Sequence, residues 1–476
     1  MGWILLGLFA LLLVVLVVRT LLFNPKPQPA LDESQVSFDK DAATDALQQL
    51  VRCKTISNND PALEDEAEFR KFIDLLPGLY PKVFEVCSFQ ELSDRGLLFR
   101  WPGKSDAEPS VMMAHYDVVP VNEGSWDKPP FDGIIENGVM WGRGTLDTKV
   151  TFNGVLSAAN ALIGQGFQPE NDIYFAFSGG EEVNGKGASN IVDFFEEKGI
   201  TPALVVDEGG AVVENVFPGV KAPCGLIGIA EKGMMNVRYT VRSAGGHASA
   251  PLPKTPITTL ASACRKIVDN PFKMHLTKPA AEMFDTLGRH SSFALKLVFA
   301  NLWLFKPVLD LICRSSGGEM NALCRTTTAF TMAEGSNARN VIPAQASLVS
   351  NMRLNPADSV ASALEYLKKT VNDTSVEITV LESFEPSRIS RTDCESWEKV
   401  ASAVAETWRG CIVSPYLMVQ CSDSRHYGRI SDRVYRFSAM DMTAEERKSI
   451  HGNNEKIRLE SIARAVEFYI RLMKKC

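Results

Sequence analysis

The pattern of hydrophobic and polar residues separates an apolar amino terminus from a long mixed region. Residues 3–18 form an unbroken apolar run, and residues 21–23 extend it after Arg19 and Thr20. About 20 apolar residues can cross the hydrocarbon of a bilayer if Arg19 reaches the interface. No basic segment precedes the run and no small-x-small cleavage site follows it. We expect residues 1–23 to be an uncleaved signal anchor or transmembrane helix, with a cleaved signal peptide as the alternative.

The segment that follows this run is expected to be a linker, residues 24–37, which is stiffened by prolines between residues 25 and 30. Arg19 and Lys26 both follow the apolar run, so the positive-inside rule gives conflicting answers on orientation. We expect a single-pass membrane protein whose catalytic part is extracytoplasmic. A cleaved or sorted segment would instead give a protein that is secreted or lies in a vacuolar or endomembrane lumen.

From residue 38 onward, helical patterns alternate with short apolar strands. Residues 40–50 have a helical pattern, and residues 111–114, 172–177 and 203–206 are predicted to be buried strands. This alternation favours an α/β sheet that is covered by helices on both faces. Ligands bind at the carboxyl ends of the strands in such sheets.

A second pattern begins near Glu231 and ends near Pro386. Residues 235–242, 325–332 and 346–353 alternate as half-exposed strands do, a helical stretch covers residues 359–371, and another strand is predicted at 376–381. We predict an inserted α+β unit, residues 231–385, between the two parts of the first domain, residues 38–230 and 386–476.

Size and composition agree with two folded units and exclude some partners. The chain has 476 residues, a length that exceeds the usual span of one hydrophobic core. Of these residues, 45% are hydrophobic and 22% are charged, as in folded globular proteins. The net charge of -7 argues against a nucleic-acid partner. The 10 cysteines include no C-x-x-C spacing and favour neither a zinc finger nor a disulfide scaffold.

Two acidic motifs directly follow predicted strands. His115 and Asp117 follow residues 111–114, and alternation would place both side chains on one side, so that the Asp could orient a metal-binding imidazole. Glu181 and Glu182 follow residues 172–177. Adjacent carboxylates repel each other unless a cation neutralises them, so one could bind a metal while the other takes a proton from water. Each motif alone is also compatible with solvated surface residues.

Three further motifs extend this set. The glycine-rich turn GRGTLDTK lacks the spacing of phosphate loops, so Asp147 within it is better interpreted as a carboxylate that bridges two cations. Asp207 and Glu208 follow residues 203–206, and His451 lies near the carboxyl end. Together these residues form a nitrogen and oxygen ligand set that suits a pair of zinc ions.

With these motifs in place, the chain resembles the dizinc exopeptidases of the aminoacylase and carboxypeptidase S branch. The resemblance is carried by the blocks AHYDVVP, WGRGTLDTK, SGGEEVNGKGA, VVDEGG, GGHASAP, NVIP, SDSRHY and HGNNEK, which occur in the family's order. It implies a zinc-exopeptidase catalytic domain of α/β class with an inserted α+β lid and dimerisation domain. It also implies a homodimer that forms through this lid.

The resemblance also implies a role for each site residue. Two Zn²⁺ ions would be bound by five residues, with Asp147 shared between them: His115, Asp147, Glu182, Glu208 and His451. Asp207 is the alternative to Glu208, and His426 the less favoured alternative to His451. Asp117 would orient His115, Glu181 would be the general base, His247 would stabilise the oxyanion, and Arg425 and Asn340 would contact the substrate.

These roles imply hydrolysis of an amide beside a free carboxylate, and formation of the amide by reversal. The expected substrates are N-acyl amino acids, especially N-fatty-acyl amino acids. A carboxypeptidase that acts on short peptides and a catalytically silent binding protein are the rival hypotheses. The apolar residues 293–313 could line an acyl-chain channel, rest on the membrane or form ordinary helical core.

Overall fold

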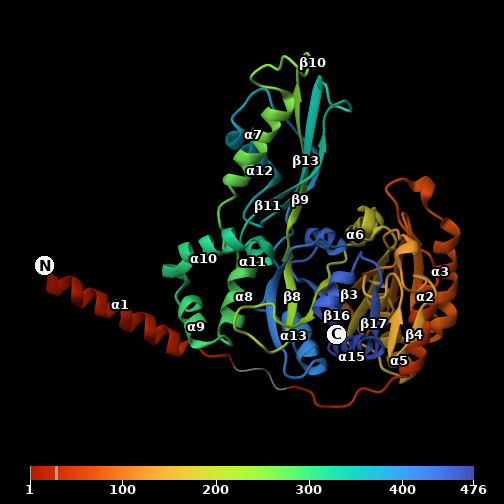
Figure 1. Cartoon of the computed structure of the whole chain (residues 1–476). Coiled ribbons are helices and arrows are strands. Elements are labelled where there is room, and N and C mark those ends of the chain that lie inside the picture. Colours follow the sequence, from red (N-terminus) through yellow and green to blue (C-terminus); the bar gives the residue numbers. More distant parts are fainter. Residues whose placement is uncertain (1, 27–30) are drawn as a thin grey trace.

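The computed structural model describes residues 2–26 and 31–476. It has a body built on a large sheet, an upper lobe built on a smaller sheet, and a projecting amino-terminal helix (Figure 1). Residues 27–30 of the predicted linker lie outside the described residues.

The body contains an eight-stranded mixed sheet whose central strands are parallel. Alternate residues of these strands enter two separate cores, as the predicted α/β sheet requires: Met112 and Ala114 face one core, Val111 and Met113 the other. In spatial order the strands are β1 (Ser88–Leu92), β2 (Gly96–Trp101), β6 (Asn171–Ser178), β3 (Ser105–His115), β7 (Leu204–Val213), β16 (Val434–Met442), β8 (Cys224–Glu231) and β15 (Ile412–Met418).

Helices cover both faces of this sheet, which confirms the predicted α/β class. On one face lie α6 (Gly187–Lys198) and η4 (Asp423–Arg429), which share a core with the sheet. Outside residues 231–385, the helices whose buried residues join the larger core are α2 (Lys40–Val51), α3 (Glu66–Leu79), α4 (Pro81–Val86), α5 (Lys149–Gly164), α13 (Glu395–Thr407) and α15 (Leu459–Met473).

The upper lobe is an antiparallel sheet of four strands with two helices packed on it. Its core is separate from that of the body. Capping boxes formed by Thr255 with Thr258 and by Ser359 with Ser362 begin the two helices. In spatial order the strands are β11 (Thr327–Glu334), β13 (Gln345–Leu354), β9 (Gly233–Arg242) and β14 (Glu377–Phe384), and the helices are α7 (Pro256–Asp269) and α12 (Val360–Val371).

Four helices within the expected insertion, residues 231–385, pack on the body rather than on the small sheet. Met283, Leu287, Phe299 and Leu309 from these helices belong to the body's larger core. The structure thus divides this segment between the two units. The helices are α8 (Lys278–Gly288), α9 (Phe293–Phe299), α10 (Leu302–Ser316) and α11 (Gly318–Cys324).

The amino-terminal helix α1 (Gly2–Leu22) projects from the body and meets it beside α9 (Figure 1). It is the one helix among the described residues that is long and apolar enough to cross a membrane, although a signal sequence has the same properties. The remaining elements are β4 (Ile134–Glu136), β5 (Val139–Trp141), β17 (Lys456–Arg458), β10 (Gly246–His247), β12 (Val341–Ile342), α14 (Ala444–Ser449), η1 (Pro61–Leu63), η2 (Glu123–Ser125) and η3 (Glu181–Val183).

Candidate metal centre and active site

The candidate site lies where parallel strands of the large sheet end. His115 is the last residue of β3 and pairs with Ser178, the last residue of β6. Glu181 and Glu182 begin η3 directly after β6. Asp207 and Glu208 were expected just after a strand, but they lie inside β7, because this strand continues to pair with β16 beyond its contact with β3.

Two histidines approach one carboxylate from opposite sides. Nε2 of His115 lies 3.0 Å from Oδ1 of Asp147, and Nε2 of His451 lies 2.9 Å from Oδ2 of the same residue. Glu208 is on the His115 side, with Oε1 at 3.3 Å from Nε2. Glu182 is on the His451 side, with Oε2 at 3.1 Å from Nε2. Asp147 therefore stands between two half-sites that share it.

The donor atoms of this cluster are close enough for shared cations. In two groups, His115 with Asp147 and Glu182, and His115 with Glu181 and Glu208, the possible ligand atoms lie within 4.8 Å of one another. Oε1 of Glu182 is buried and has no hydrogen-bond partner within residues 2–26 and 31–476. Imidazole nitrogens and carboxylate oxygens are ligands that suit zinc, so the residues present fit divalent metal ions.

Burial and mutual charge shift the pKa values of this cluster. Burial alone would lower the pKa of His115, but the charge of Glu208 and hydrogen bonds to Asp117, Asp147 and Glu208 raise it well above its usual value. Burial raises the pKa of Glu208 to about 8 and that of Glu181 well above its usual value, and neighbouring carboxylates add to both shifts. Bound cations would relieve this crowding of negative charge.

Asp117 holds two parts of the cluster together from a fully buried position. Its Oδ1 lies 3.4 Å from Nδ1 of His115, and its two carboxylate oxygens accept the backbone N–H groups of Glu181 and Glu182 at 3.1 and 3.2 Å. The hydroxyl of Ser57 donates to Oδ2 at 2.6 Å. Asp117 thus positions the acidic turn as well as the histidine that the sequence pointed to.

Sequence reasoning missed Glu455, which organises the turn that carries Asp147. This buried carboxylate accepts the N–H groups of Leu146 and Asp147 at 2.7 and 3.3 Å, and that of Gly144 at 3.2 Å. Arg143 donates to it at 2.6 Å. The block HGNNEK contained this residue, but nothing in its letters indicated which distant turn it would hold.

The two neighbouring acids of β7 point in different directions. Glu208 joins the cluster beside His115, whereas Asp207 accepts the backbone N–H of Ser424 at 2.8 Å and that of Glu208 at 2.9 Å. His426, the less favoured alternative to His451, lies on η4 and belongs to neither group of possible metal ligands. Burial and the charge of Arg425 lower its pKa to about 4.

Arg425 lies at the rim of the cluster on η4. It donates to the carbonyl of Ser422 at 2.8 Å and to Oδ1 of Asn184 at 3.3 Å, and its guanidinium lies 5.0 Å from the centre of the Phe384 ring. Burial would lower its pKa, but the charges of Asp423 and other carboxylates, Glu181 among them, raise it. A charged, partly held guanidinium near Glu181 is suited to bind an anion.

His247 and Asn340 are not part of this cluster within one chain. Both are exposed at the tip of the upper lobe, where β10 pairs with β12 (Figure 1). Nδ1 of His247 lies 2.7 Å from the hydroxyl of Ser249, and the carbonyl of Asn340 accepts the N–H of Ala248 at 2.9 Å. The predicted oxyanion donor His247 and the predicted substrate contact Asn340 thus lie together, but away from the acids of the same chain.

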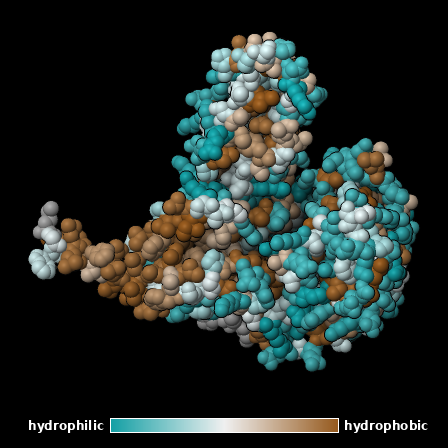
Figure 2. Space-filling model, viewed as in Figure 1, coloured by the Kyte–Doolittle hydropathy of each residue, from teal (hydrophilic) through white to brown (hydrophobic). Residues whose placement is uncertain are grey.

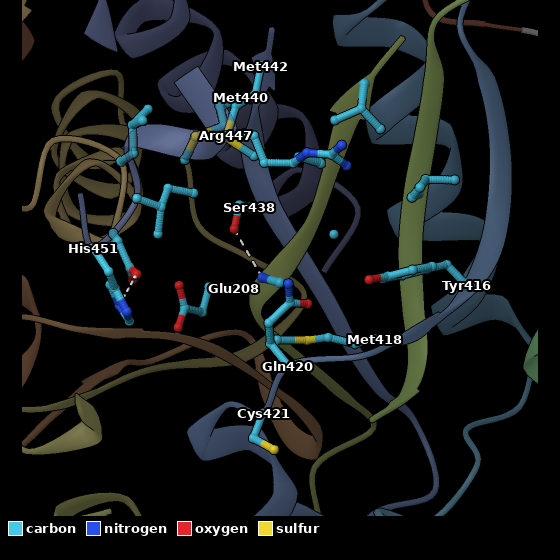
Figure 3. Close-up of a pocket in the computed structure, with 18 of the residues that line it drawn as sticks. Glu208, Tyr416, Met418, Gln420, Cys421, Ser438, Met440, Met442, Arg447 and His451 are labelled. Atoms are coloured by element: carbon cyan, nitrogen blue, oxygen red, sulfur yellow. Dashed lines mark hydrogen bonds and ion pairs between the residues drawn. The ribbon is translucent and has the colours of Figure 1, made fainter. Parts of the chain in front are cut away.

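A cavity of about 380 Å³ opens directly off the acidic cluster (Figure 3). Glu208 and His451 border one part, and the labelled residues around the rest include three methionines and Tyr416 together with the polar residues Gln420, Ser438 and Arg447. Residues 293–313 contribute nothing to its lining. The apolar side chains around it are Leu146, Ala211, Val213, Leu226, Tyr416, Met418, Met440, Met442 and Ile450.

The chain is similar in sequence, over most of its length, to two named proteins. Probable carboxypeptidase S-like 2 of Dictyostelium discoideum is 33% identical over 478 aligned residues, which cover 97% of this chain and 92% of the relative. The N-fatty-acyl-amino acid synthase/hydrolase PM20D1 of Xenopus tropicalis is 35% identical over 436 residues, covering 90% of this chain and 85% of the relative.

Solved structures share the fold at low sequence identity. The M20 family metallo-carboxypeptidase Sso-CP2 from Sulfolobus solfataricus superposes with a TM-score of 0.66 at 18% identity, covering 91% of this chain and 98% of the other. Human carnosine dipeptidase 1 gives a TM-score of 0.64 at 14% identity, covering 92% and 96%. The model of the family described as Peptidase family M20/M25/M40 matches residues 111–475. The chain therefore belongs to peptidase family M20/M25/M40.

Proposed function

We propose that this protein is a metal-dependent amidohydrolase that cleaves the amide bond of N-acyl amino acids, and N-fatty-acyl amino acids in particular. By reversal the same site would form the amide from a carboxylic acid and an amine. One observation carries the proposal: the acidic cluster opens directly into a cavity in which methionine, leucine, valine and isoleucine side chains form one part of the wall, and polar side chains such as Gln420 and Arg447 form another. Relatives such as PM20D1 of Xenopus tropicalis, which is named an N-fatty-acyl-amino acid synthase/hydrolase, support the substrate class.

The metal ions would be two Zn²⁺ held by the cluster, with Asp147 shared between them. The proposed ligands are His115 and Glu208 on one side and Glu182 and His451 on the other. When bound, such ions lower the pKa of water and stabilise negative charge on a carbonyl oxygen. The position of Asp147 between two imidazoles supports its role as the shared ligand.

Glu181 would serve as general base and then as general acid. Its carboxylate lies with His115 and Glu208 in one group, yet it is not needed to complete either half-site. From this position Glu181 would accept a proton from attacking water and pass it to the leaving amine. Asp117 would keep Glu181 in place through its carboxylate, and His115 through its backbone carbonyl, 3.0 Å from Nδ1, and through Oδ1 at 3.4 Å.

Substrate would be held at both ends of the scissile amide. Arg425 would bind the free carboxylate, because a charged guanidinium offers paired donors to a planar anion. The acyl chain would lie in the cavity, where flexible methionine side chains such as Met418, Met440 and Met442 adapt to different chain lengths.

The upper lobe would act as a lid and dimerisation unit. We assign it within residues 231–385, and the catalytic unit to residues 38–230 and 386–476. His247 would stabilise the oxyanion and Asn340 would contact the substrate. Their neighbouring positions at an exposed tip support a role that requires lid closure or the lobe of a second copy in a homodimer.

The amino-terminal helix α1 would tether the enzyme to a membrane as a signal anchor, residues 1–23, followed by a linker, residues 24–37. Its length and its apolar, exposed surface support this placement. The catalytic unit would then face an extracytoplasmic space, or be secreted if the segment is cleaved.

A carboxypeptidase acting on short peptides is the second candidate, because probable carboxypeptidase S-like 2 aligns with 97% of this chain. The two candidates are separated by giving the purified full chain an N-oleoyl amino acid and a blocked dipeptide that carry the same carboxyl-terminal residue. We expect faster turnover of the N-oleoyl substrate. Turnover of the dipeptide with neglect of the N-oleoyl substrate would replace the proposed function by the second candidate.

A further inference from the structure

Helices α9 and α10 carry an exposed apolar surface that folding does not explain. It continues the apolar surface of α1 as one band along the side of the body (Figure 2). The upper lobe has its own apolar hollow, which Ile257 and Val268 help to line, and the other exposed large hydrophobic residues of the body and lobe are scattered along the sequence. The exposed members of this surface, which we call the α9–α10 face, are Phe293, Trp303, Leu304, Val308, Leu311 and Ile312.

On α10, an apolar side of the helix faces outward. Leu304, Val308 and Ile312 recur every four residues of α10, so they form one stripe. The opposite side of α10 already packs on the body through the buried residues Leu309 and Cys313. A helix of a water-soluble surface would have polar residues on its outer stripe, so the apolar stripe calls for a partner.

The corner between α9 and α10 is joined to α1. Arg19 donates to the carbonyl of Ala300 at 2.9 Å and to Oδ1 of Asn301 at 3.2 Å. The side-chain amide of Asn301 donates to the carbonyl of Leu16 at 3.3 Å. Leu16 and Thr20 are the buried residues of α1, so α1 packs against the body at this corner.

The depth of this contact along α1 fixes where a bilayer would meet the body. Leu16 lies six residues before Leu22, the last residue of α1. At the rise of an α-helix this is about 9 Å. A bilayer that surrounds α1 therefore reaches the corner at Ala300 and Asn301. Amphipathic helices rest at about this depth, roughly 5–10 Å into the boundary between headgroups and acyl chains.

We propose that the α9–α10 face docks on the lipid bilayer, as a second membrane contact beside α1. The proposal rests on the membrane placement of α1 given above. The partner is the hydrocarbon boundary of the bilayer, with Trp303 at a position suited to the interface and Lys306 available to headgroups. Glu319, which follows α10 on α11, lines the cavity, so docking would bring the substrate site close to membrane-held acyl chains.

The test uses tryptophan as an internal probe of the full chain in bilayer nanodiscs. Trp3 on α1 and Trp303 on α10 are the tryptophans with strongly exposed side chains, at 87% and 58%. Lipids that carry bromine near the headgroup end of their acyl chains quench tryptophans that touch them. The comparison is between Trp3→Phe, which leaves Trp303 as reporter, Trp303→Phe, which leaves Trp3, and the double variant as background.

We expect brominated lipid to quench the fluorescence of the Trp3→Phe chain clearly more than that of the double variant. If Trp303→Phe retains quenching while Trp3→Phe matches the background, α1 is inserted but the docking proposal is overturned. If neither single variant exceeds the background, the membrane placement of α1 fails as well. If Trp303 is not quenched by brominated lipid, and Leu311→Asp abolishes self-association of the chain, the face binds a second copy and the proposal is overturned.

Discussion

The acidic cluster of the body and the tip of the upper lobe hold their side chains in contrasting ways. In the cluster, Asp117 and Glu455 are fully buried and bind backbone groups of distant segments. At the tip, His247 is exposed and its Nδ1 hydrogen-bonds to Ser249, two residues away. The segments that carry Asp147, Glu181 and Glu182 are thus held by buried groups, whereas the proposed oxyanion donor lies on an exposed tip.

This difference indicates how the work of the site is divided. A preorganised cluster stabilises charge without reorganisation during the reaction, which is an efficient use of fixed polar groups. An exposed donor on a separate lobe can instead make the reaction depend on closure or on a second copy. Loss of cluster groups should therefore impair chemistry in every chain, while loss of tip groups should be repairable from another chain.

The largest effect is expected for Glu181→Gln. The amide keeps the size of the side chain but cannot accept the proton, so kcat should fall by roughly 10²–10⁴-fold. Metal content, measured by elemental analysis, should stay unchanged because Glu181 is not a proposed ligand. Glu197→Gln on the exposed surface of α6 is the matched control and should keep full activity. Full activity of Glu181→Gln would remove Glu181 from the mechanism.

His247→Ala should lower kcat by about 10²–10³-fold, the usual loss for one oxyanion donor. Its effect should be separable from that of Glu181 because the two residues lie on different units. Mixing inactive His247→Ala chains with inactive Glu181→Gln chains should restore part of the activity, since a mixed dimer would contain one intact site. No recovery in chains shown to exchange subunits would place the action of the tip within a single chain.

Glu455→Gln tests whether the cluster depends on its buried support. Weaker binding of the Leu146 and Asp147 backbone groups should misplace the proposed shared ligand and lower metal affinity by about 10–100-fold. The activity of this variant should recover at high metal concentration, whereas the activity of an unfolded variant would not. Unchanged metal affinity in a titration would show that the turn keeps its shape without this carboxylate.

The smallest effect is expected for Met442→Trp in the cavity. A larger side chain should shorten the space for an acyl chain, lowering kcat/KM for long-chain substrates by about 10-fold while short-chain substrates are little affected. Met332→Trp, at an exposed methionine on β11, is the matched control. Equal losses for long and short chains would place the acyl group elsewhere.

Much of the fold followed from local patterns, because strands and helices of the body carry their periodicity in sequence. The strand at residues 111–114 and the helix at 40–50 are present within β3 and α2. The packing of α8 to α11 on the body was not foreseeable from periodicity, since an apolar helix looks the same whether its partner is the large sheet, the small sheet or a membrane.

The same limit applies to the site: residues marked by a local pattern could be predicted, whereas contacts between distant segments could not. His115, Glu181 and Glu182 stood out because they follow strands, and the parallel pairing of β3 and β6 brings them together. Glu455 supports a turn about three hundred residues earlier in the chain, a relation that exists only after folding. The separation of His247 from the acids likewise depends on the orientation of a whole lobe, which no motif encodes.

The most direct test of the account is hydrolysis of an N-oleoyl amino acid by the purified full chain before and after chelation, with bound zinc counted on the same samples. We expect about two zinc ions per chain, loss of turnover when they are removed, and recovery when zinc returns. Turnover that persists in the metal-free protein would contradict the central claim that the His115, Asp147 and His451 cluster is a metal-dependent amidohydrolase site.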